Sequence, residues 1–157
     1  EVMGIDKDFG LAYAKSQISS GNSLPTKGLA FISLKDKHKN EGIDLAKKLV
    51  ELNFTLCGTE GTANTIQKNG IKCKKINKVS GGSPHIVDVL NAKKIALVIN
   101  TGGGKRAYRI LDSTSLRRAT LINKVPYCTN MSTAYACLEG IKSLKSKKIT
   151  VTSLQDI

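Results

Sequence analysis

Tryptophan is absent from this 157-residue sequence, and aromatic residues make up only 4% of it. Leu, Ile, Val and Ala must therefore supply the hydrophobic core, for which the overall hydrophobic share of 40% is sufficient. At this length the chain fits one domain of ordinary size, and it buries enough surface to fold without disulfides or metals.

Long apolar runs and metal-ligand spacings are also lacking. The longest apolar run is about five residues, at 95–99, against the ~20 that a transmembrane helix needs. No signal-peptide pattern stands at the start. Neither the two histidines nor the four cysteines show metal-ligand spacing, and three of the cysteines lie in apolar segments. We expect a cytoplasmic protein with reduced core cysteines, no metal and no membrane partner.

The charge balance is strongly positive, because 25 Lys and Arg against 12 Asp and Glu give +13 at pH 7. Such a charge raises the question of nucleic acid. The basic residues are spread along the chain, however, and no nucleic-acid motif accompanies them. We interpret them as a solvated, Lys-rich surface. A general nucleic-acid binder is a rival interpretation, which strong salt dependence without a preference for mononucleotides would favour.

Residues 1–27 are interpreted as a tail and linker, with a helical stretch at 9–18 and a flexible Ser-, Gly- and Pro-containing connection at 19–25. Strands and helices alternate from Gly28 onward. Strands are predicted at 29–34, 54–57, 71–76, 95–100 and 126–129, with 149–151 as a candidate edge strand. Helices are predicted at 43–50, after the turn at 58–62, and at 84–90, 115–122 and 133–144.

This alternation, with continuous apolar strands, predicts a parallel sheet covered on both faces. Right-handed crossovers then make residues 28–157 an α/β domain with a Rossmann-like, doubly wound, mainly parallel five-stranded sheet.

Ligands of such sheets bind outside the carboxyl ends of the strands, so the loops that follow strands share one rim. Gly58 and Gly61 allow the backbone to approach an anion closely, and Thr59 and Thr62 add hydroxyl groups. The helix that starts near Thr62 directs N–H groups and the positive end of its dipole to the same point. The loop at 58–62 is therefore predicted to bind an anion.

Other loops of this rim carry Lys39, Lys78 and Asn100. The two lysines can neutralise a phosphate, and the Asn100 amide suits a base or ribose edge. Each charge-assisted hydrogen bond contributes about 1.5–3 kcal/mol, so three or four cover much of the ~8 kcal/mol of a micromolar complex. Each residue alone has a plainer interpretation, since Gly-Thr turns are common and loop lysines are usually solvated. Their convergence on one rim favours a phosphorylated ligand.

Four sequence runs resemble the methylglyoxal-synthase-like domain superfamily: GTEGTA at 58–63, INKV at 76–79, PHIVD at 84–88 and INT at 99–101. Together with GKRA at 104–107 and LRR at 116–118, the series is similar to the regulatory domain of carbamoyl phosphate synthetase. The first 15 residues resemble the segment that closes the second ATP-grasp half of that subunit. Because the sequence begins at Glu1 in mid-pattern, we interpret it as a piece of a longer polypeptide.

The resemblance implies a site for a nucleotide monophosphate, UMP or IMP, at positions that match Lys39, Thr59, Gly61, Thr62, Lys78, Asn100 and Thr101. It also implies an ornithine site with Tyr127 and Thr129, where the domain meets the synthetic domain. These two sites use different loops, so we expect them to share no direct contact. Gly102 departs from the family pattern, where a hydroxyl side chain is common near the nucleotide, and Cys128 replaces a polar residue.

The resemblance further implies a parent enzyme that makes carbamoyl phosphate from bicarbonate, glutamine-derived ammonia and ATP, for arginine and pyrimidine biosynthesis. That parent uses ATP with Mg²⁺, and K⁺, and pairs its large subunit with a small glutaminase subunit. For this domain alone we expect no cofactor, no catalytic residue and no synthetase activity.

A methylglyoxal-synthase-like lyase, acting on a phosphorylated triose, is the alternative within the same superfamily. That chemistry needs a carboxylate base beside the phosphate site. The family's catalytic loop places Asp directly after Gly-Gly, whereas here Ser83 follows Gly81 and Gly82. Asp88 lies a helical turn further on and is expected to be structural, and Glu60 has no second catalytic group to pair with.

Overall fold

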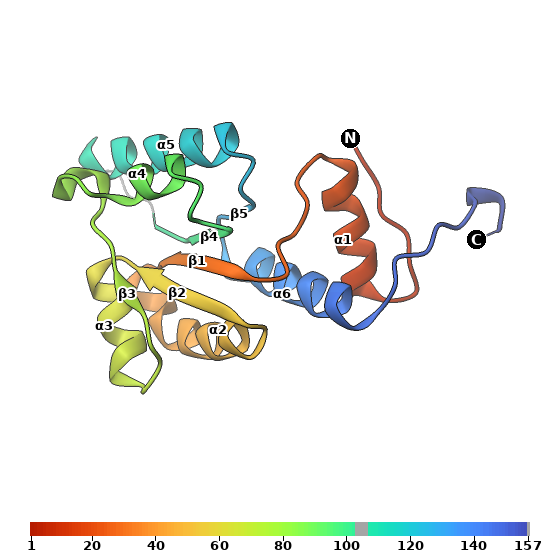
Figure 1. Ribbon diagram of the computed structural model, residues 1–157, viewed down its shortest axis with the longest axis horizontal. Coiled ribbons are helices and arrows are strands. Elements are labelled where there is room, and N and C mark those ends of the chain that lie inside the picture. The colour runs from red at the N-terminus through yellow and green to blue at the C-terminus, as the bar shows by residue number, and fades with distance from the viewer. Residues whose placement is uncertain (103–106, 157) are drawn as a thin grey trace.

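The computed structural model of the chain describes residues 1–102 and 107–156 (Figure 1). Its helices are α1 (Phe9–Ser19), α2 (Lys39–Glu51), α3 (Glu60–Lys68), α4 (Ile86–Asn91), α5 (Ala107–Ile122) and α6 (Met131–Ser146). Its strands are β1 (Gly28–Ser33), β2 (Phe54–Gly58), β3 (Lys74–Lys75), β4 (Leu97–Asn100) and β5 (Tyr127–Cys128). Short 3₁₀ turns occur at Asp36–His38, Val79–Gly81 and Leu154–Asp156.

The strands form one five-stranded sheet in the order β3-β2-β1-β4-β5, and all its pairs are parallel. The predicted doubly wound parallel sheet is therefore confirmed. The strand order reverses between β1 and β4, because the chain moves outward from β1 to β3 and then returns to the other side of β1. This reversal creates a crevice at the carboxyl ends of β1 and β4.

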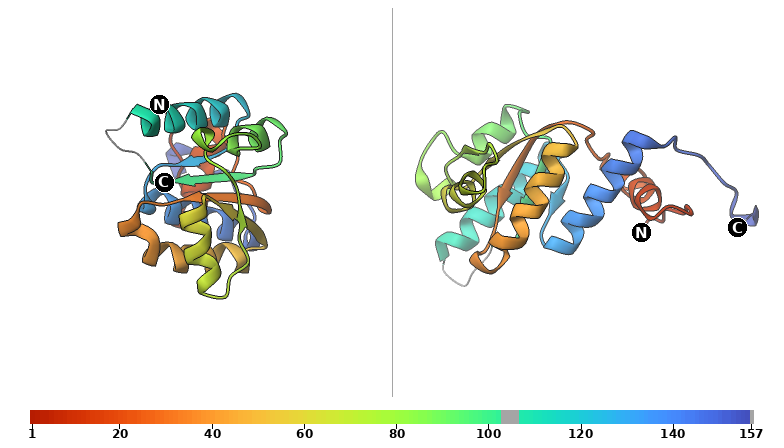
Figure 2. Two further views of the ribbon diagram at one scale, coloured as in Figure 1. Left: turned by 90° about the vertical axis from the view of Figure 1, so that its left-hand side faces the viewer. Right: turned by 90° about the horizontal axis from the view of Figure 1, so that it is seen from below.

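Helices cover both faces of the sheet (Figures 1 and 2). On the face covered by α2, α3 and α6, Ile32 and Ile99 join a core of mostly aliphatic side chains. On the face covered by α4 and α5, Phe31 and Val98 belong to a second, smaller core. Neighbouring residues of one strand thus serve opposite cores, as the alternation of side chains along a strand requires.

Two strand predictions need correction. The segment at 71–76 forms only the two-residue strand β3, because Cys73 turns into the core and β2 offers just Cys57 and Gly58 as partners. Residues 149–151 form no strand, since α6 carries the chain away from the sheet (Figure 1) and leaves Val151 exposed.

Three helix starts also differ from the prediction, and for α6 and α4 a cap explains the difference. Asn130 accepts a hydrogen bond from the Thr133 backbone N–H at 2.8 Å, so α6 begins at Met131 rather than at 133. Asp88 accepts one from the His85 N–H at 2.8 Å, so α4 begins after His85. Helix α5 begins at Ala107, upstream of the predicted start at 115.

Helix α1, within the segment interpreted as tail and linker, packs along α6 (Figures 1 and 2). Leu11 and Ala14 are buried there. The approach needs a glycine, because a Cβ on Gly10 of α1 would lie 2.4 Å from the backbone carbonyl oxygen of Glu139 on α6. At the start of α1, Asp8 accepts hydrogen bonds from the Leu11 N–H and from the Ser143 hydroxyl on α6. The domain boundary after residue 27 stays a prediction.

No helix within the described ranges is long and apolar enough to cross a membrane.

Candidate functional site

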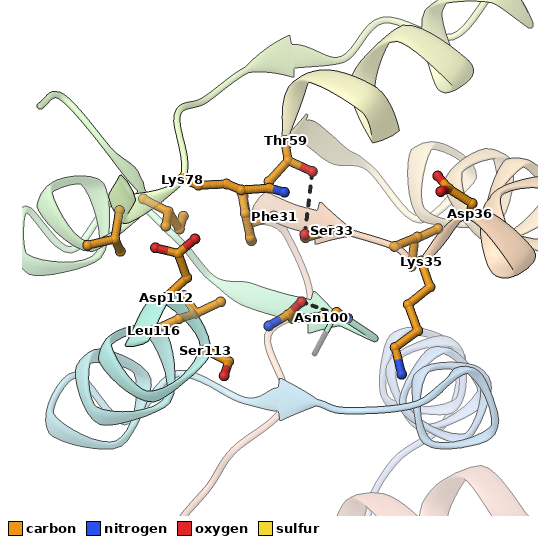
Figure 3. Close-up of a pocket in the computed structure, with 14 residues that line it drawn as sticks. Phe31, Ser33, Lys35, Asp36, Thr59, Lys78, Asn100, Asp112, Ser113 and Leu116 are labelled. Atoms are coloured by element: carbon orange, nitrogen blue, oxygen red, sulfur yellow. Dashed lines mark hydrogen bonds between the residues drawn. The ribbon is translucent and has the colours of Figure 1, made fainter. Parts of the chain in front are cut away.

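A pocket of about 320 Å³ opens at the carboxyl ends of β1 and β4, on the sheet face that α4 and α5 cover (Figure 3). It therefore lies at the reversal of strand order, where ligands of such sheets bind. Its lining comes from β1 and the loop after it, the start of α3, the loop before α4, the end of β4, and α5. The lining residues are Phe31, Ser33, Leu34, Lys35, Asp36, Thr59, Lys78, Val79, Ile86, Asn100, Gly102, Asp112, Ser113 and Leu116.

Three polar side chains form the floor of this pocket. Ser33 and Asn100 are register partners at the ends of β1 and β4. Thr59 follows β2, and its hydroxyl lies 3.4 Å from the Ser33 hydroxyl as a donor (Figure 3). Thr59 and Asn100 are each only 6% exposed. Buried polar groups at a pocket floor are already positioned to bind a ligand without further ordering.

The start of α3 lies directly beside this floor. Thr59 is the N-cap residue of α3, but its hydroxyl makes no capping hydrogen bond. The first turn of a helix leaves backbone N–H groups without an intrahelical partner, which favours an anion. Thr62 is buried, and its hydroxyl accepts the Leu34 N–H at 3.0 Å. Thr62 therefore fixes the β1–α2 loop to α3 and is not among the residues that line the pocket.

Lys39 is the first residue of α2 and carries its charge to the start of α3. A Cβ on Gly61 would lie 3.3 Å from the Lys39 Nζ, so the glycine makes room for the ammonium group. Lys39 Nζ lies 2.7 Å from a carboxylate oxygen of Asp36, which is largely exposed. An exposed ion pair of this kind is weak, so a phosphate can replace the carboxylate.

Lys78 reaches the pocket from the loop between β3 and α4 and extends toward Thr59 (Figure 3). Asp112 of α5 holds this loop, because its carboxylate accepts the Ser80 N–H at 2.9 Å and the Ser80 hydroxyl at 2.8 Å. Asp112 was not predicted as a site residue. A single Asp inside a helix gives no local signal, and its role depends on contact with a loop 32 residues away.

Thr101 is 3% exposed and does not line the pocket. Its hydroxyl accepts the Lys35 N–H at 3.1 Å and lies 3.0 Å from the His38 Nδ1. Thr101 therefore positions the β1–α2 loop, which supplies Lys35, Asp36 and Lys39. His38 was not predicted to have a role.

Asn100 makes two side-chain contacts that connect different loops. Its Oδ1 accepts the Gly102 N–H at 2.9 Å, and its Nδ2 donates to the Tyr127 hydroxyl at 3.0 Å. A hydrogen bond thus joins residues assigned to the two predicted sites, although these residues lie on different loops. The reason is the register of the sheet, which pairs Val98 with Tyr127 and places Tyr127 on the same face as Asn100. Thr129 lies just after β5 and is exposed.

The carboxylate considered for lyase chemistry has a structural role. The Asp88 Oδ2 accepts the His85 N–H at 2.8 Å and the Ser83 hydroxyl at 2.9 Å. These hydrogen bonds, and the nearby His85 side chain, hold the pKa of Asp88 below its usual value. Asp88 caps α4 and is absent from the pocket lining. This agrees with the structural role expected from the sequence.

The cysteines are also structural. All four are buried and free. Burial raises the pKa of Cys57 to about 12 and that of Cys73 to about 11, so both thiols stay protonated at neutral pH. Across residues 1–102 and 107–156, no group of His, Cys, Asp and Glu side chains is arranged to hold a metal ion.

The family model of the MGS-like domain matches residues 41–129, which run from the first turn of α2 to the residue after β5 and contain every strand of the sheet except β1. The chain belongs to the MGS-like domain family. The resemblance inferred from the sequence motifs is thus confirmed. Of those motifs, GKRA at 104–107 lies mostly outside the described residues.

The chain is 46% identical over 158 residues to the carbamoyl phosphate synthase large chain, C-terminal section, of Methanopyrus kandleri. That alignment covers 100% of this chain and 29% of the relative. The section of the same name from Aquifex aeolicus is 46% identical over 162 residues, which cover 100% of this chain and 30% of that relative. The large chain of Mesorhizobium japonicum is 44% identical over 99% of this chain and 13% of its own length. The chain thus spans less than a third of these relatives.

The crystal structure of methylglyoxal synthase from Elizabethkingia anophelis superposes with a TM-score of 0.55 at 18% identity. The superposition covers 73% of this chain and 79% of that chain. At this identity the likeness concerns the fold, and it agrees with the parallel sheet described above.

Proposed function

We propose that this chain is an allosteric effector-binding domain of a carbamoyl phosphate synthetase large chain, and that its pocket binds a nucleoside monophosphate, UMP or IMP. The observation that carries the proposal is the meeting of Lys78, Thr59 and Asn100 in one pocket at the switch point of the sheet. The sequence similarity to carbamoyl phosphate synthase large chains supports the choice of parent.

The phosphate of the nucleotide fits the side of the pocket next to α3. Lys39 and Lys78 bring positive charge from two loops, and the first turn of α3 adds backbone N–H groups. The Thr59 hydroxyl makes no capping hydrogen bond and has only long contacts, of 3.3–3.4 Å, with the Thr62 and Ser33 hydroxyls, so it can turn to the phosphate as a further donor. A phosphate held by several such groups gains about 1.5–3 kcal/mol from each charge-assisted hydrogen bond.

The base and ribose fit the remaining part of the pocket. Val79, with the buried side chains of Phe31, Ile86 and Leu116 behind it, gives this part of the pocket an apolar lining. Asn100 adds a polar group at the edge of this surface. An apolar lining with a few fixed polar groups is typical of sites for small organic ligands.

The parent is proposed to make carbamoyl phosphate from bicarbonate, glutamine-derived ammonia and ATP, with the small glutaminase subunit as a partner. Its ATP, Mg²⁺ and K⁺ belong to other domains in this proposal, so the isolated chain turns over no ATP. We further propose that ornithine binds where Tyr127 and Thr129 face the synthetic domain. Their position just before α6, which carries α1, supports this part of the proposal.

Calorimetric titration of the isolated chain with UMP and IMP tests the nucleotide proposal. Lys78→Ala is expected to weaken both nucleotides about ten- to a hundredfold, the effect of losing one charge-assisted hydrogen bond of about 1.5–3 kcal/mol. Binding of uridine or inosine, which lack the phosphate, is expected to change little.

Lys75→Ala is the matched control, because Lys75 is exposed on β3, at the entry to the same loop. It removes the same charge without touching the pocket and is expected to leave nucleotide affinity nearly unchanged. Equal losses for nucleotide and nucleoside in Lys78→Ala would show that the phosphate does not lie at Lys78. Absence of any nucleotide binding would contradict the function itself.

A further inference from the structure

The side-chain amide of Asn100 has a defined orientation. A backbone N–H can only donate, so the atom 2.9 Å from the Gly102 N–H must be the amide oxygen, Oδ1. The amide nitrogen then faces the Tyr127 hydroxyl, to which it donates at 3.0 Å. The ambiguity between amide oxygen and nitrogen, which often affects Asn side chains, is removed by this backbone partner.

The Gly102 N–H sets this orientation, and two features of its surroundings accommodate it. A Cβ at position 102 would lie 2.7 Å from the Asn100 Oδ1, so only glycine leaves room for the oxygen. Tyr127 projects from β5 on the same sheet face, and its hydroxyl, which can donate or accept, acts as the acceptor that anchors the nitrogen once the Gly102 N–H has fixed the oxygen. Turning the amide over would bring its NH₂ group against the Gly102 N–H, where two donors face each other.

The orientation decides what Asn100 offers to a ligand. The amide nitrogen carries two N–H groups, and one of them is engaged by Tyr127. In Figure 3 the nitrogen is turned toward α5, on the side of Ser113 and Leu116, while the oxygen is turned to the opposite side. The pocket therefore meets Asn100 as a hydrogen-bond donor.

We propose that Tyr127 and Gly102 are specificity-determining positioning residues, which hold Asn100 as a donor so that the pocket selects a ligand with an acceptor at this point. For a nucleotide, this favours a base that turns a carbonyl oxygen to Asn100 over one that has an exocyclic amino group at the same position. The inference rests on the proposed function, because it takes the ligand of the pocket to be a nucleotide. Loss of an acceptor partner for a buried donor is costly, which is the source of the discrimination.

The test compares the affinities of UMP and CMP, which differ in a carbonyl and an amino group on the same ring, with IMP and AMP as the purine pair. The wild-type chain is expected to prefer the carbonyl member of each pair. Tyr127→Phe removes the acceptor that holds the amide and is expected to reduce this preference about fivefold, the effect of one ordinary hydrogen bond. Binding of inorganic phosphate, which does not reach Asn100, is expected to stay the same.

Two further variants complete the design. Gly102→Ala displaces the amide oxygen without altering the sheet and is expected to lower the preference as Tyr127→Phe does, should the latter fold poorly. Tyr135→Phe is the matched control, because its hydroxyl binds Asp44 at 3.0 Å on the surface, away from the pocket. It is expected to leave the preference unchanged.

The outcomes separate this inference from the function on which it rests. If the wild-type chain bound both members of a pair equally, or if neither Tyr127→Phe nor Gly102→Ala changed the preference, the positioning role would be wrong while nucleotide binding stood. If the wild-type chain bound inorganic phosphate but no nucleotide, the proposed function would fail first.

Discussion

The two faces of the sheet are covered by helices but are used differently. On the face of α2, α3 and α6, side chains such as Leu45, Leu49 and Ile141 are fully buried. The face of α4 and α5 has a smaller core, and at its carboxyl-end rim it opens into the pocket. Stability and binding thus draw on different parts of one sheet, and substitutions can separate them.

The largest expected effect is a loss of stability, from a substitution in the core on the face of α2, α3 and α6. Leu49→Ala removes a fully buried side chain from the larger core, and a Leu→Ala change of this kind costs about 2–5 kcal/mol of unfolding free energy. Chemical denaturation measures the loss. Val50→Ala, on the exposed side of the same helix, is the control and is expected to cost less than about 0.5 kcal/mol. A loss of nucleotide affinity in folded Leu49→Ala would contradict the separation of the two faces.

Substitutions at the pocket on the face of α4 and α5 are expected to change nucleotide affinity more than the free energy of unfolding. Asp112→Ala releases Ser80 and with it the loop that carries Lys78. Nucleotide affinity is expected to fall about fivefold, while the unfolding midpoint changes little, because Ser80 is exposed and the contact is at the surface. Titration calorimetry and thermal denaturation of the same variant measure both quantities.

A double-mutant cycle tests this assignment. Ser80→Ala alone is expected to weaken binding, and adding it to Asp112→Ala should bring little further loss, since both remove one contact. Thr114→Ala, at an exposed position of α5, serves as the control. Full additivity of the two losses would mean that Asp112 acts on the ligand by another route.

The smallest expected effect concerns α1, which packs on α6 rather than on either face of the sheet and is held there partly by charge. The hydrogen bonds from Lys147, Ser143 and the Leu11 N–H hold the pKa of Asp8 well below its usual value of 3.8. Because the folded-state pKa is lowered, Asp8 stabilises the folded chain above pH 3.8, and this contribution is lost as the pH falls through the folded-state pKa.

Thermal denaturation of the wild type and Asp8→Asn as a function of pH measures this contribution. The melting temperature of the variant is expected to lie slightly below that of the wild type at neutral pH, and the difference should shrink below pH 3.8. A difference that stayed constant from neutral pH to strongly acidic pH would show that the Asp8 charge does not help to hold α1.

Local sequence patterns identified most of the fold, and the exceptions have physical causes. The buried strands β1, β2 and β4 were found because a short, continuous apolar run between helical segments is typical of a strand that is buried on both faces. The edge strand β3 was predicted too long, since the pattern around Cys73 does not reveal how many partners β2 offers. The start of α5 was missed because helix periodicity is weak in its first half.

The site residues that could be predicted are those placed in the pocket simply because they follow a strand. Thr59, Lys78 and Asn100 follow strands, so the parallel topology brings them to one pocket. Thr62 and Thr101 were placed at the right rim, but they bind the β1–α2 loop instead of lining the pocket. Asp112 and the Asn100–Tyr127 contact escaped prediction because they depend on how α5 and β5 pack, which no short motif encodes.

Helix α6 connects the two ends of the molecule. It begins three residues after Cys128, and it contains 16 residues, which corresponds to a rod about 24 Å long. Its first turn follows the strand that carries Tyr127, and its second half carries α1. A tilt of this rod at the pocket end therefore displaces α1 at the other end, and with it any chain that precedes Glu1. Helix α6 thus mechanically couples β5, which carries Tyr127, to α1 at the opposite end of the domain.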